Sequence, residues 1–182
     1  MYWGLAAGSG NPSEAAIFDP VTGFGGNGSA TSTVPYTQCV LNGLLTALRP
    51  QYWNTERIPH CLTRVFARSS PIDMLGAEYS REVVAEVSAE TDYDSFRHRL
   101  ESGPHAAIHE AIGGRDPKPV GWGDLNPSSS PNESLFFLHH TDVDRLWWLW
   151  QERSPKTRID AYNGHRIDGN DSAPASLDAS SP

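Results

Sequence analysis

Residues 134–152 constrain the fold more than any other part of this chain. A helix drawn through the segment is apolar on nearly every side, with Leu135, Phe136, Phe137, Leu138, Val143, Leu146, Trp147, Trp148, Leu149 and Trp150. Ser134 or Asn132 can cap such a helix at its start. A helix that is apolar all round is typical of a protein core. We therefore expect a buried helix near residues 134–152, with the rest of the chain packed around it.

Three shorter helices are expected before it. Ser80 can cap a helix near residues 80–89, and Asp92 or Asp94 can cap a second one that ends before a Gly-Pro pair. A third helix, over residues 104–112, begins at a proline, which the first helical turn tolerates, and ends at two glycines. These signals predict a mainly α fold.

Length and composition narrow the class of protein further. The chain has 182 residues, which suits one domain with a real core, and its 16 Gly and 14 Pro residues predict long irregular connections. The formal net charge of −8 argues against a nucleic-acid partner. No apolar run approaches the roughly 20 residues of a membrane-spanning helix. Residues 1–20 show no signal-peptide pattern, so the compartment stays open, and secretion is compatible with a missing true N-terminus.

Two histidines on the third expected helix point to a metal site. His105 and His109 are four residues apart, so their rings leave the same helix face about one turn apart and can converge on one ion. A surface pair is the usual alternative for this spacing. The neighbouring Ala107, Ile108 and Ile112 favour the metal site, because two unpaired rings are costly to bury among apolar residues.

The doublet His139-His140 lies inside the long apolar segment. Adjacent helix positions diverge by roughly 100°, so at most one ring of the doublet can share a metal with the first pair. Asp144 follows His140 by four residues and can orient a ring or pair with Arg145. The alternative is a structural Asp–Arg pair beside a satisfied core histidine. Three imidazoles and a supporting carboxylate favour the metal site.

Three neutral imidazoles suit copper or zinc, and the order of affinities favours copper. A zinc protease needs a glutamate directly after the first histidine or just before the second. Those positions hold Ala106 and Ile108, which excludes that class. A zinc hydrase with three histidines stays chemically possible.

These residues resemble the second copper site of the tyrosinase and catechol oxidase family, the type-3 copper phenol oxidases. The family pattern is His-x-x-x-His, a Gly-rich loop, then Asn-Asp-Pro-x-Phe-Phe-x-His-His-x-x-x-Asp-Arg-x-Trp. The matching run here is Pro104-His105-Ala-Ala-Ile-His109-Glu-Ala-Ile-Gly113-Gly114, followed by Asn132-Glu-Ser-Leu-Phe136-Phe137-Leu-His139-His140-Thr-Asp-Val-Asp144-Arg145-Leu-Trp147.

The resemblance implies copper as the cofactor and half of a four-helix copper bundle, with long Gly- and Pro-rich loops, as the fold. His105, His109 and His140 would be the ligands, because the family uses the second histidine of the doublet. Asp144 and His139 would support these ligands without binding the metal.

The resemblance to short fungal members extends upstream, over Asp19 to Gly28 and around Cys39 and Cys61. From the residues alone, one disulfide and two free buried thiols are equally open for the two cysteines. In the resembling proteins they pair, which implies a Cys39–Cys61 bridge. We expect residues 1–165 to be the C-terminal, second-copper part of such a copper domain and residues 166–182 to be a polar tail.

The family reaction oxidises o-diphenols to o-quinones with O2. Ala106 stands where members that hydroxylate monophenols often have Asn, so oxidation of diphenols is the expected activity. The departure Glu133-Ser134, in place of Asp-Pro, changes the helix cap without touching a ligand.

The histidines of a first copper site are missing, and we expect the chain to be truncated at both ends. One copper accepts one electron whereas a catechol gives up two, so the half-site alone is expected to be inactive. Activity would need a dimer or a first copper half from elsewhere. The rival interpretation is a non-catalytic mononuclear metal-binding remnant or an incomplete gene product.

Overall fold

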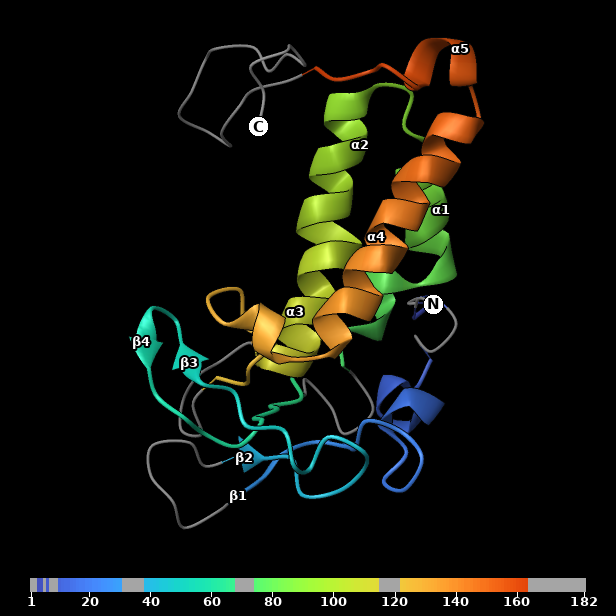
Figure 1. Ribbon diagram of the computed structural model, residues 1–182. Coiled ribbons are helices and arrows are strands. Elements are labelled where there is room, and N and C mark those ends of the chain that lie inside the picture. The colour runs from blue at the N-terminus through green and yellow to red at the C-terminus, as the bar shows by residue number, and fades with distance from the viewer. Residues whose placement is uncertain are drawn as a thin grey trace.

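The computed structural model describes residues 3–4, 6, 10–30, 38–67, 74–114 and 122–163. Helices form one end of the molecule, and loops with two short hairpins form the other (Figure 1). The helices are α1 (Arg81–Ala89), α2 (Tyr93–Leu100), α3 (Ala106–Gly113), α4 (Leu135–Glu152) and α5 (Pro155–Arg158). The fold is therefore mainly α, as the sequence predicts. The expected tail at 166–182 lies outside the described residues.

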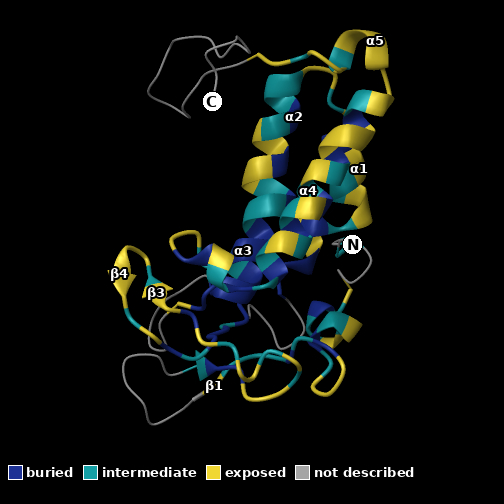
Figure 2. Ribbon diagram, in the orientation of Figure 1, coloured by how far each residue is buried: buried dark blue, intermediate teal, exposed yellow. Residues whose placement is uncertain are grey.

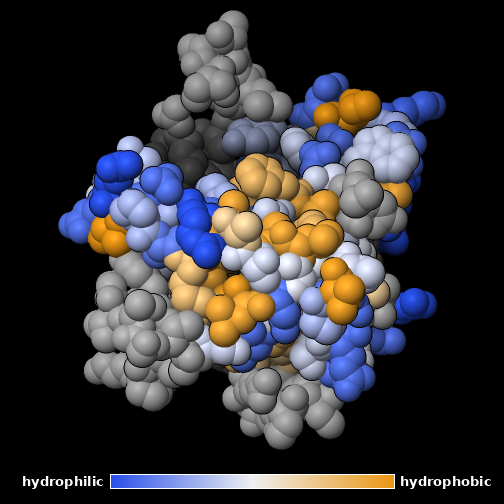
Figure 3. All heavy atoms as spheres, turned by 60° about the horizontal axis from the view of Figure 1, so that its bottom comes forward, coloured by the Kyte–Doolittle hydropathy of each residue, from blue (hydrophilic) through white to orange (hydrophobic). Residues whose placement is uncertain are grey.

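Short elements shape the loop-rich end. Strand β1 (Ser29–Ala30) pairs antiparallel with β2 (Gln38–Cys39), and β3 (Tyr52–Trp53) pairs antiparallel with β4 (Glu56–Arg57). Single 3₁₀ turns occur at Pro12–Glu14, Ala16–Phe18, Gly76–Tyr79 and Ser130–Asn132. Viewed from this end, hydrophobic residues gather in the middle of a mixed surface (Figure 3).

The predicted caps of the first two helices are confirmed. The Ser80 side chain accepts a hydrogen bond from the Val83 amide at 3.3 Å, and the Asp92 side chain accepts one from the Ser95 amide at 3.1 Å. These bonds satisfy amides that have no partner within the helix. Gly114, with a φ of 90°, ends α3 in a conformation that favours glycine.

Helices α2 and α3 are joined by a single π-helical turn, Glu101–His105, rather than by a loop. Gly103 leaves the helical region there (φ −107°, ψ −107°), one residue before Pro104. Proline has no amide hydrogen to donate to the hydrogen-bond pattern of a regular helix, and the wider π-helical turn lets the chain continue past Pro104. This turn sets the position of His105 at the entrance to α3.

The expectation that α4 is buried all round is wrong. Its buried residues follow one stripe, at Leu135, His139, Asp142, Leu146 and Trp150. Its outer face is open, with Phe137 59% and Trp148 55% exposed, and Figure 2 shows the alternation along the helix. The described helices α1 and α2 cover only one side of α4, so the apolar residues of the other side face outward.

The apolar core has two parts. Val87, Phe96, Leu100, Leu146 and Trp150 join α1, α2 and α4. The larger part surrounds α3 and the start of α4, and consists of Phe18, Phe66, Met74, Leu75, Tyr79, Ala107, Ile108, Ala111, Ile112, Leu125 and Leu135. The larger part includes residues of α3 and α4 that are neighbours of the histidines in the chain, so it supports the helices that carry the candidate site.

A buried ion pair fixes the start of α4. Arg64 and Glu133 are both fully buried, with Nη2 and Oε2 2.9 Å apart. The Leu135 amide donates to Glu133 Oε1 at 3.3 Å, so Glu133 takes the place of the Ser134 or Asn132 cap that the sequence predicts. The family's Asp-Pro is thus replaced by a residue that binds both an arginine and the helix start.

Cys39 and Cys61 form a disulfide, with a Cα–Cα distance of 5.6 Å. This confirms the bridge that the resemblance implies. Within the described residues, no helix is long and apolar enough to cross a membrane.

Candidate metal centre

Four histidines from two segments meet at one point of the fold. His105 ends the π-helical turn, His109 lies on α3, and His139 and His140 lie on α4. Each offers a ring nitrogen, and these nitrogens lie within 4.8 Å of one another. The structure therefore brings together the three expected ligands and adds His139 as a fourth member. We call these four residues the histidine cluster.

His109 and His140 face each other most directly. Their Nε2 atoms are 3.3 Å apart, and His109 Nδ1 lies 2.8 Å from the backbone oxygen of Leu125. A carbonyl oxygen only accepts, so Nδ1 of His109 carries the proton and Nε2 keeps its lone pair. Two imidazole nitrogens bound to one tetrahedral ion at about 2.05 Å would lie about 3.3 Å apart. The observed spacing fits a shared metal ion.

His105 completes the expected set of ligands. Its ring centroid is 4.8 Å from that of His109 and 5.0 Å from that of His140. Its Nδ1 lies 3.1 Å from Glu101 Oε2, one helical turn earlier, although the alignment is not that of a hydrogen bond. Glu101 is not among the predicted site residues, although its i,i+4 spacing from His105 is a signal in the sequence.

His139 is fully buried and differs from the other three in its contacts. Its Nε2 lies 3.2 Å from the backbone oxygen of His105, to which it can donate a hydrogen bond. Its ring stacks on that of His105, with centroids 5.2 Å apart and an angle of 12° between the ring planes. Its Nδ1 is buried and has no hydrogen-bond partner among the residues that the structure describes. His139 thus holds the backbone that carries His105, while its ring stays inside the cluster.

Burial keeps three rings of the cluster, those of His105, His139 and His140, neutral near pH 7. Burial, and then the charge on His109, lowers the pKa of His105 to about 4. Burial, followed by the charges on His105 and His109, lowers the pKa of His140 to about 4. The same causes lower the pKa of His139 to about 2. Because a histidine must be deprotonated at the binding nitrogen to hold a metal, these rings suit a metal ion at neutral pH.

A cavity of about 310 Å³ opens beside the cluster. His105, His109 and His140 line it together with Glu101, Ala106, Glu110, Pro127, Ser130 and Phe136. The Phe136 ring lies against that of His140, with centroids 4.0 Å apart. The cavity is large enough for a small aromatic molecule.

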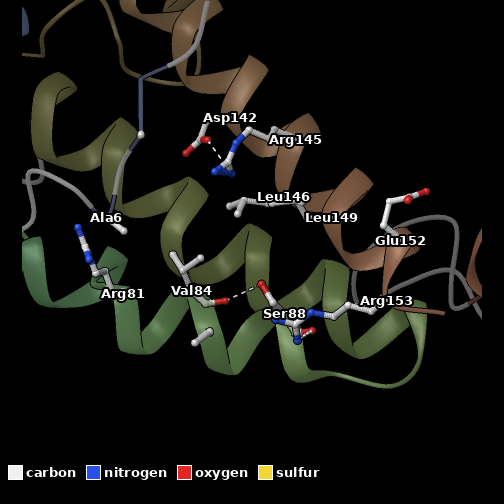
Figure 4. A pocket seen from close by; sticks show the side chains of 12 residues that line it. Ala6, Arg81, Val84, Ser88, Asp142, Arg145, Leu146, Leu149, Glu152 and Arg153 are labelled. Carbon is white, nitrogen blue, oxygen red and sulfur yellow. Dashed lines mark hydrogen bonds and ion pairs between the residues drawn. The ribbon is translucent and has the colours of Figure 1, made fainter. Parts of the chain in front are cut away.

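A larger cavity, of about 660 Å³, lies between α1 and α4 (Figure 4). Arg81, Arg145 and Arg153 line it, and Arg145 lies beside Asp142 on α4, with Nη1 and Oδ1 3.5 Å apart. None of its lining residues belongs to the histidine cluster. We therefore place the candidate chemistry in the smaller cavity.

Asp144, the carboxylate expected to support a ligand, lies on the exposed side of α4. Its side chain is exposed on α4, whereas Asp142, two residues earlier, is buried and contacts Arg145. The ring of His140 turns toward α3, where its Nε2 lies 3.3 Å from that of His109. The exposure of Asp144 gives no support for a role in orienting a ligand.

The remaining described histidines lie outside the cluster. His60 pairs with Asp124 in the loop-rich end, and His98 is half exposed beside Asp94. His165 lies outside the described residues. Among the residues that the structure describes, the histidine cluster is the one group of side chains that could hold a metal ion.

Comparison with known proteins agrees with this geometry. A family model described as the common central domain of tyrosinase matches residues 2–153. The chain is 37% identical over 178 residues to the tyrosinase-like protein phomQ1' of Diaporthe leptostromiformis, covering 90% of this chain and 44% of that protein. It is 30% identical over 169 residues to the tyrosinase ustQ of Aspergillus flavus, covering 91% and 45%.

Among solved structures, a variant polyphenol oxidase from Thermothelomyces thermophila superposes with a TM-score of 0.56 at 25% identity. The match covers 82% of this chain and 46% of that one. The chain thus spans about half the length of the curated relatives that it matches.

Proposed function

This chain belongs to the tyrosinase family of copper oxidoreductases, and from that premise we propose that it contributes one copper site to the oxidation of o-diphenols to o-quinones by O2. His105, His109 and His140 would hold the copper. Copper bound there would supply one-electron redox chemistry toward O2. The observation that carries the proposal is the convergence of these three rings at one point.

The residues around the cluster support a phenolic substrate. Phe136 packs on His140 and gives the cavity an aromatic wall against which a phenol ring can stack. Glu101 and Glu110 place carboxylates on the cavity lining, where they can accept hydrogen bonds from substrate hydroxyls. An anionic substrate would be repelled there, so a neutral diphenol fits best.

Ala106 favours diphenols over monophenols. Its methyl group lines the cavity beside His105 and offers no polar atom to a phenolic hydroxyl. Hydroxylation of a monophenol needs that hydroxyl to lose its proton early, and this position gives no help. Oxidation of an o-diphenol therefore suits this cavity better than hydroxylation.

Electron balance calls for a second copper. Conversion of an o-diphenol to an o-quinone releases two electrons and two protons, and one copper accepts one electron. We place the second copper site outside the described residues of one chain. Its source is a second copy of this chain or further residues of a longer form.

The test measures copper binding and quinone formation together. The copper-loaded chain is assayed with a catechol over a wide range of protein concentrations, and a longer form that includes any upstream coding sequence is assayed beside it. His109→Asn and His140→Asn should abolish copper binding and quinone formation. His98→Asn is the matched control, because His98 lies outside the cluster.

Quinone formation that rises with protein concentration, or that appears in the longer form, supports the proposal. Copper binding with background oxidation in every arm would overturn the oxidase function and leave the mononuclear remnant. Full activity of the isolated monomer would overturn the need for a second copper site.

A further inference from the structure

The ring of His109 is held by a backbone carbonyl, and that carbonyl belongs to a loop with a buried carboxylate at its centre. We propose that Asp124 is a positioning residue for the copper site: it fixes the Leu125 carbonyl and, through it, the ring of His109. This inference rests on the proposed role of His109 as a copper ligand. Asp124 itself does not touch the histidine cluster.

Asp124 is fully buried and its carboxylate is saturated with hydrogen bonds. Oδ1 accepts from His60 Nε2 at 3.0 Å and from Asn132 Nδ2 at 2.9 Å. Oδ2 accepts from the Thr63 amide at 2.7 Å and from the Thr63 hydroxyl at 2.9 Å. A buried carboxylate is costly unless it is paired in this way. We call Asp124 and these three partners the Asp124 network.

The Asp124 network ties together the segments that flank the site. Thr63 forms an isolated antiparallel bridge with the disulfide-bonded Cys39, and Asn132 lies just before α4, which carries His140. The Asp124 amide also donates to the Thr63 oxygen at 2.9 Å. One carboxylate thus fixes the loop behind His109 relative to the start of the helix that carries the facing ligand.

His60 makes the network rigid. Its Nδ1 lies 2.6 Å from the Ile58 oxygen while its Nε2 lies 3.0 Å from Asp124 Oδ1. Both partners are acceptors, so the two contacts favour the doubly protonated ring, a cation facing the carboxylate. The side chains of this pair are 1% and 0% exposed, which makes the loss of either partner costly.

The loop has little freedom to adjust. The Gly123 amide donates to the Gly113 oxygen at the end of α3, at 2.8 Å. A Cβ added at Gly123 would meet the Val65 nitrogen at 2.9 Å, so the backbone here is closely packed. The Leu125 carbonyl is therefore held in place by its own loop rather than by the ring that it accepts from.

A fixed carbonyl matters to the metal because it selects the tautomer of His109. A proton held on Nδ1 leaves Nε2 as the only lone pair, and the ring orientation aims that lone pair at His140. Groups of this kind around a metal ligand typically change metal affinity by about 10- to 100-fold when they are removed. A purely structural residue would lower stability without a selective effect on the metal.

The experiment compares Asp124→Asn with Val87→Ala in the full chain. Val87 is buried between the helices, away from the network, so its truncation lowers stability without touching the loop. Cu²⁺ affinity is measured by competition with a chelator, and the bound ion is examined by electron paramagnetic resonance. We expect Asp124→Asn to weaken Cu²⁺ binding about 10- to 100-fold and to change the copper hyperfine splitting. Val87→Ala should change neither.

Thr63→Val keeps the inference testable if Asp124→Asn does not fold, because it removes one hydrogen bond of the network at nearly constant volume. It should weaken Cu²⁺ binding less than Asp124→Asn, and Thr63→Ser should restore it. Wild-type affinity and spectrum in the folded Asp124→Asn or Thr63→Val chain would overturn the inference. So would equal weakening by Val87→Ala at matched stability.

The two proposals fail in different ways. If His109→Asn leaves Cu²⁺ binding unchanged, the copper site itself is wrong. If His109→Asn abolishes binding and the network variants leave it unchanged, the copper site stands and only the positioning role of Asp124 is overturned.

Discussion

His109 and His140 lie 31 residues apart in the chain, on different helices, and their Nε2 atoms are 3.3 Å apart. In the metal-free protein one of these nitrogens must carry a proton, because two facing lone pairs would repel each other. The His109 Nδ1 proton is already committed to the Leu125 carbonyl, so the shared proton comes from His140. A metal ion that displaces this proton would bind both rings without moving either helix.

Substitutions of His139 and His140 should show which of the two binds the metal and which only supports the site. His140→Gln removes a ring that lines the cavity, and we expect it to abolish tight Cu²⁺ binding. His139→Gln removes a ring whose Nε2 contacts the His105 backbone, and we expect about one Cu²⁺ still to bind, with an affinity reduced by about 10- to 100-fold. Calorimetric titration of both variants measures this. The reverse order of effects would make His139 the ligand.

The Arg64–Glu133 pair should be essential for stability. Arg64 also donates to the backbone oxygens of Phe24, Gly25 and Gly26, so it fastens the N-terminal loop to the start of α4. Glu133→Gln leaves a buried guanidinium without its counter-charge, and we expect a loss of about 3–5 kcal/mol in the free energy of unfolding. Urea denaturation monitored by tryptophan fluorescence measures it.

A surface pair gives the matched control for that prediction. Glu86 lies 3.1 Å from Arg99, and its side chain is 65% exposed. Glu86→Gln should cost less than about 1 kcal/mol, because exposed ion pairs contribute little. If Glu133→Gln and Glu86→Gln lower the free energy of unfolding equally, burial does not make the Arg64–Glu133 pair more important for stability than an exposed pair.

The sequence predicts the local features of this fold well. Ser80 and Asp92 cap their helices as expected, since a cap depends on residues within one turn. The convergence of His105 and His109 with the doublet on α4 could be predicted, because each pattern is a local signature and the family motif links them. Hydrophobic pattern alone does not reveal which face of α4 is covered, because coverage depends on neighbours distant in sequence.

Long-range polar contacts explain the other differences. Glu133 pairs with Arg64, 69 residues away, and no local pattern signals that contact. The Leu125 carbonyl that orients His109 is a backbone group, which the sequence cannot mark at all. In the sequence, Asp124 is one acidic residue in a Gly- and Pro-rich loop, and nothing in that pattern predicts that its side chain is buried.

The disulfide should stabilise the loop-rich end of the protein. Cys39 and Cys61 are 22 residues apart, and closing a loop of that length stabilises a chain by about 3 kcal/mol in the entropic account. We expect the double substitution Cys39→Ser and Cys61→Ser to lower the free energy of unfolding by about 2–4 kcal/mol. The same loss should follow reduction of the wild type, and the double variant should be insensitive to reductant.

His60 should make stability depend on pH. Burial lowers the pKa of His60, but its hydrogen bonds to Asp124 and Ile58 outweigh burial and raise the pKa above 6.5. The folded chain therefore keeps a proton that the unfolded chain releases near pH 6.5. The resulting stability is fully present below pH 6.5 and is lost as the pH rises through the raised value.

His60→Gln removes that titration. In the presence of a metal chelator, we expect the urea midpoint of the wild type to fall more steeply above pH 6.5 than that of His60→Gln. Midpoints measured from pH 6 to pH 9 compare the two chains. Parallel curves would show that His60 holds its proton no more tightly in the folded chain than in the unfolded one.

Copper titration of the isolated chain should saturate near one ion per chain, because among the described residues only the histidine cluster gathers metal-binding side chains. A single Cu²⁺ has one unpaired electron, so the loaded protein should give a full electron paramagnetic resonance signal. Two nearby coupled Cu²⁺ ions would cancel that signal. Double integration against a Cu²⁺ standard, together with total copper by mass spectrometry, gives both numbers. Two ions per chain with a silent spectrum would mean that a second copper site forms within this chain, and the electron balance of diphenol oxidation would then be met without a partner.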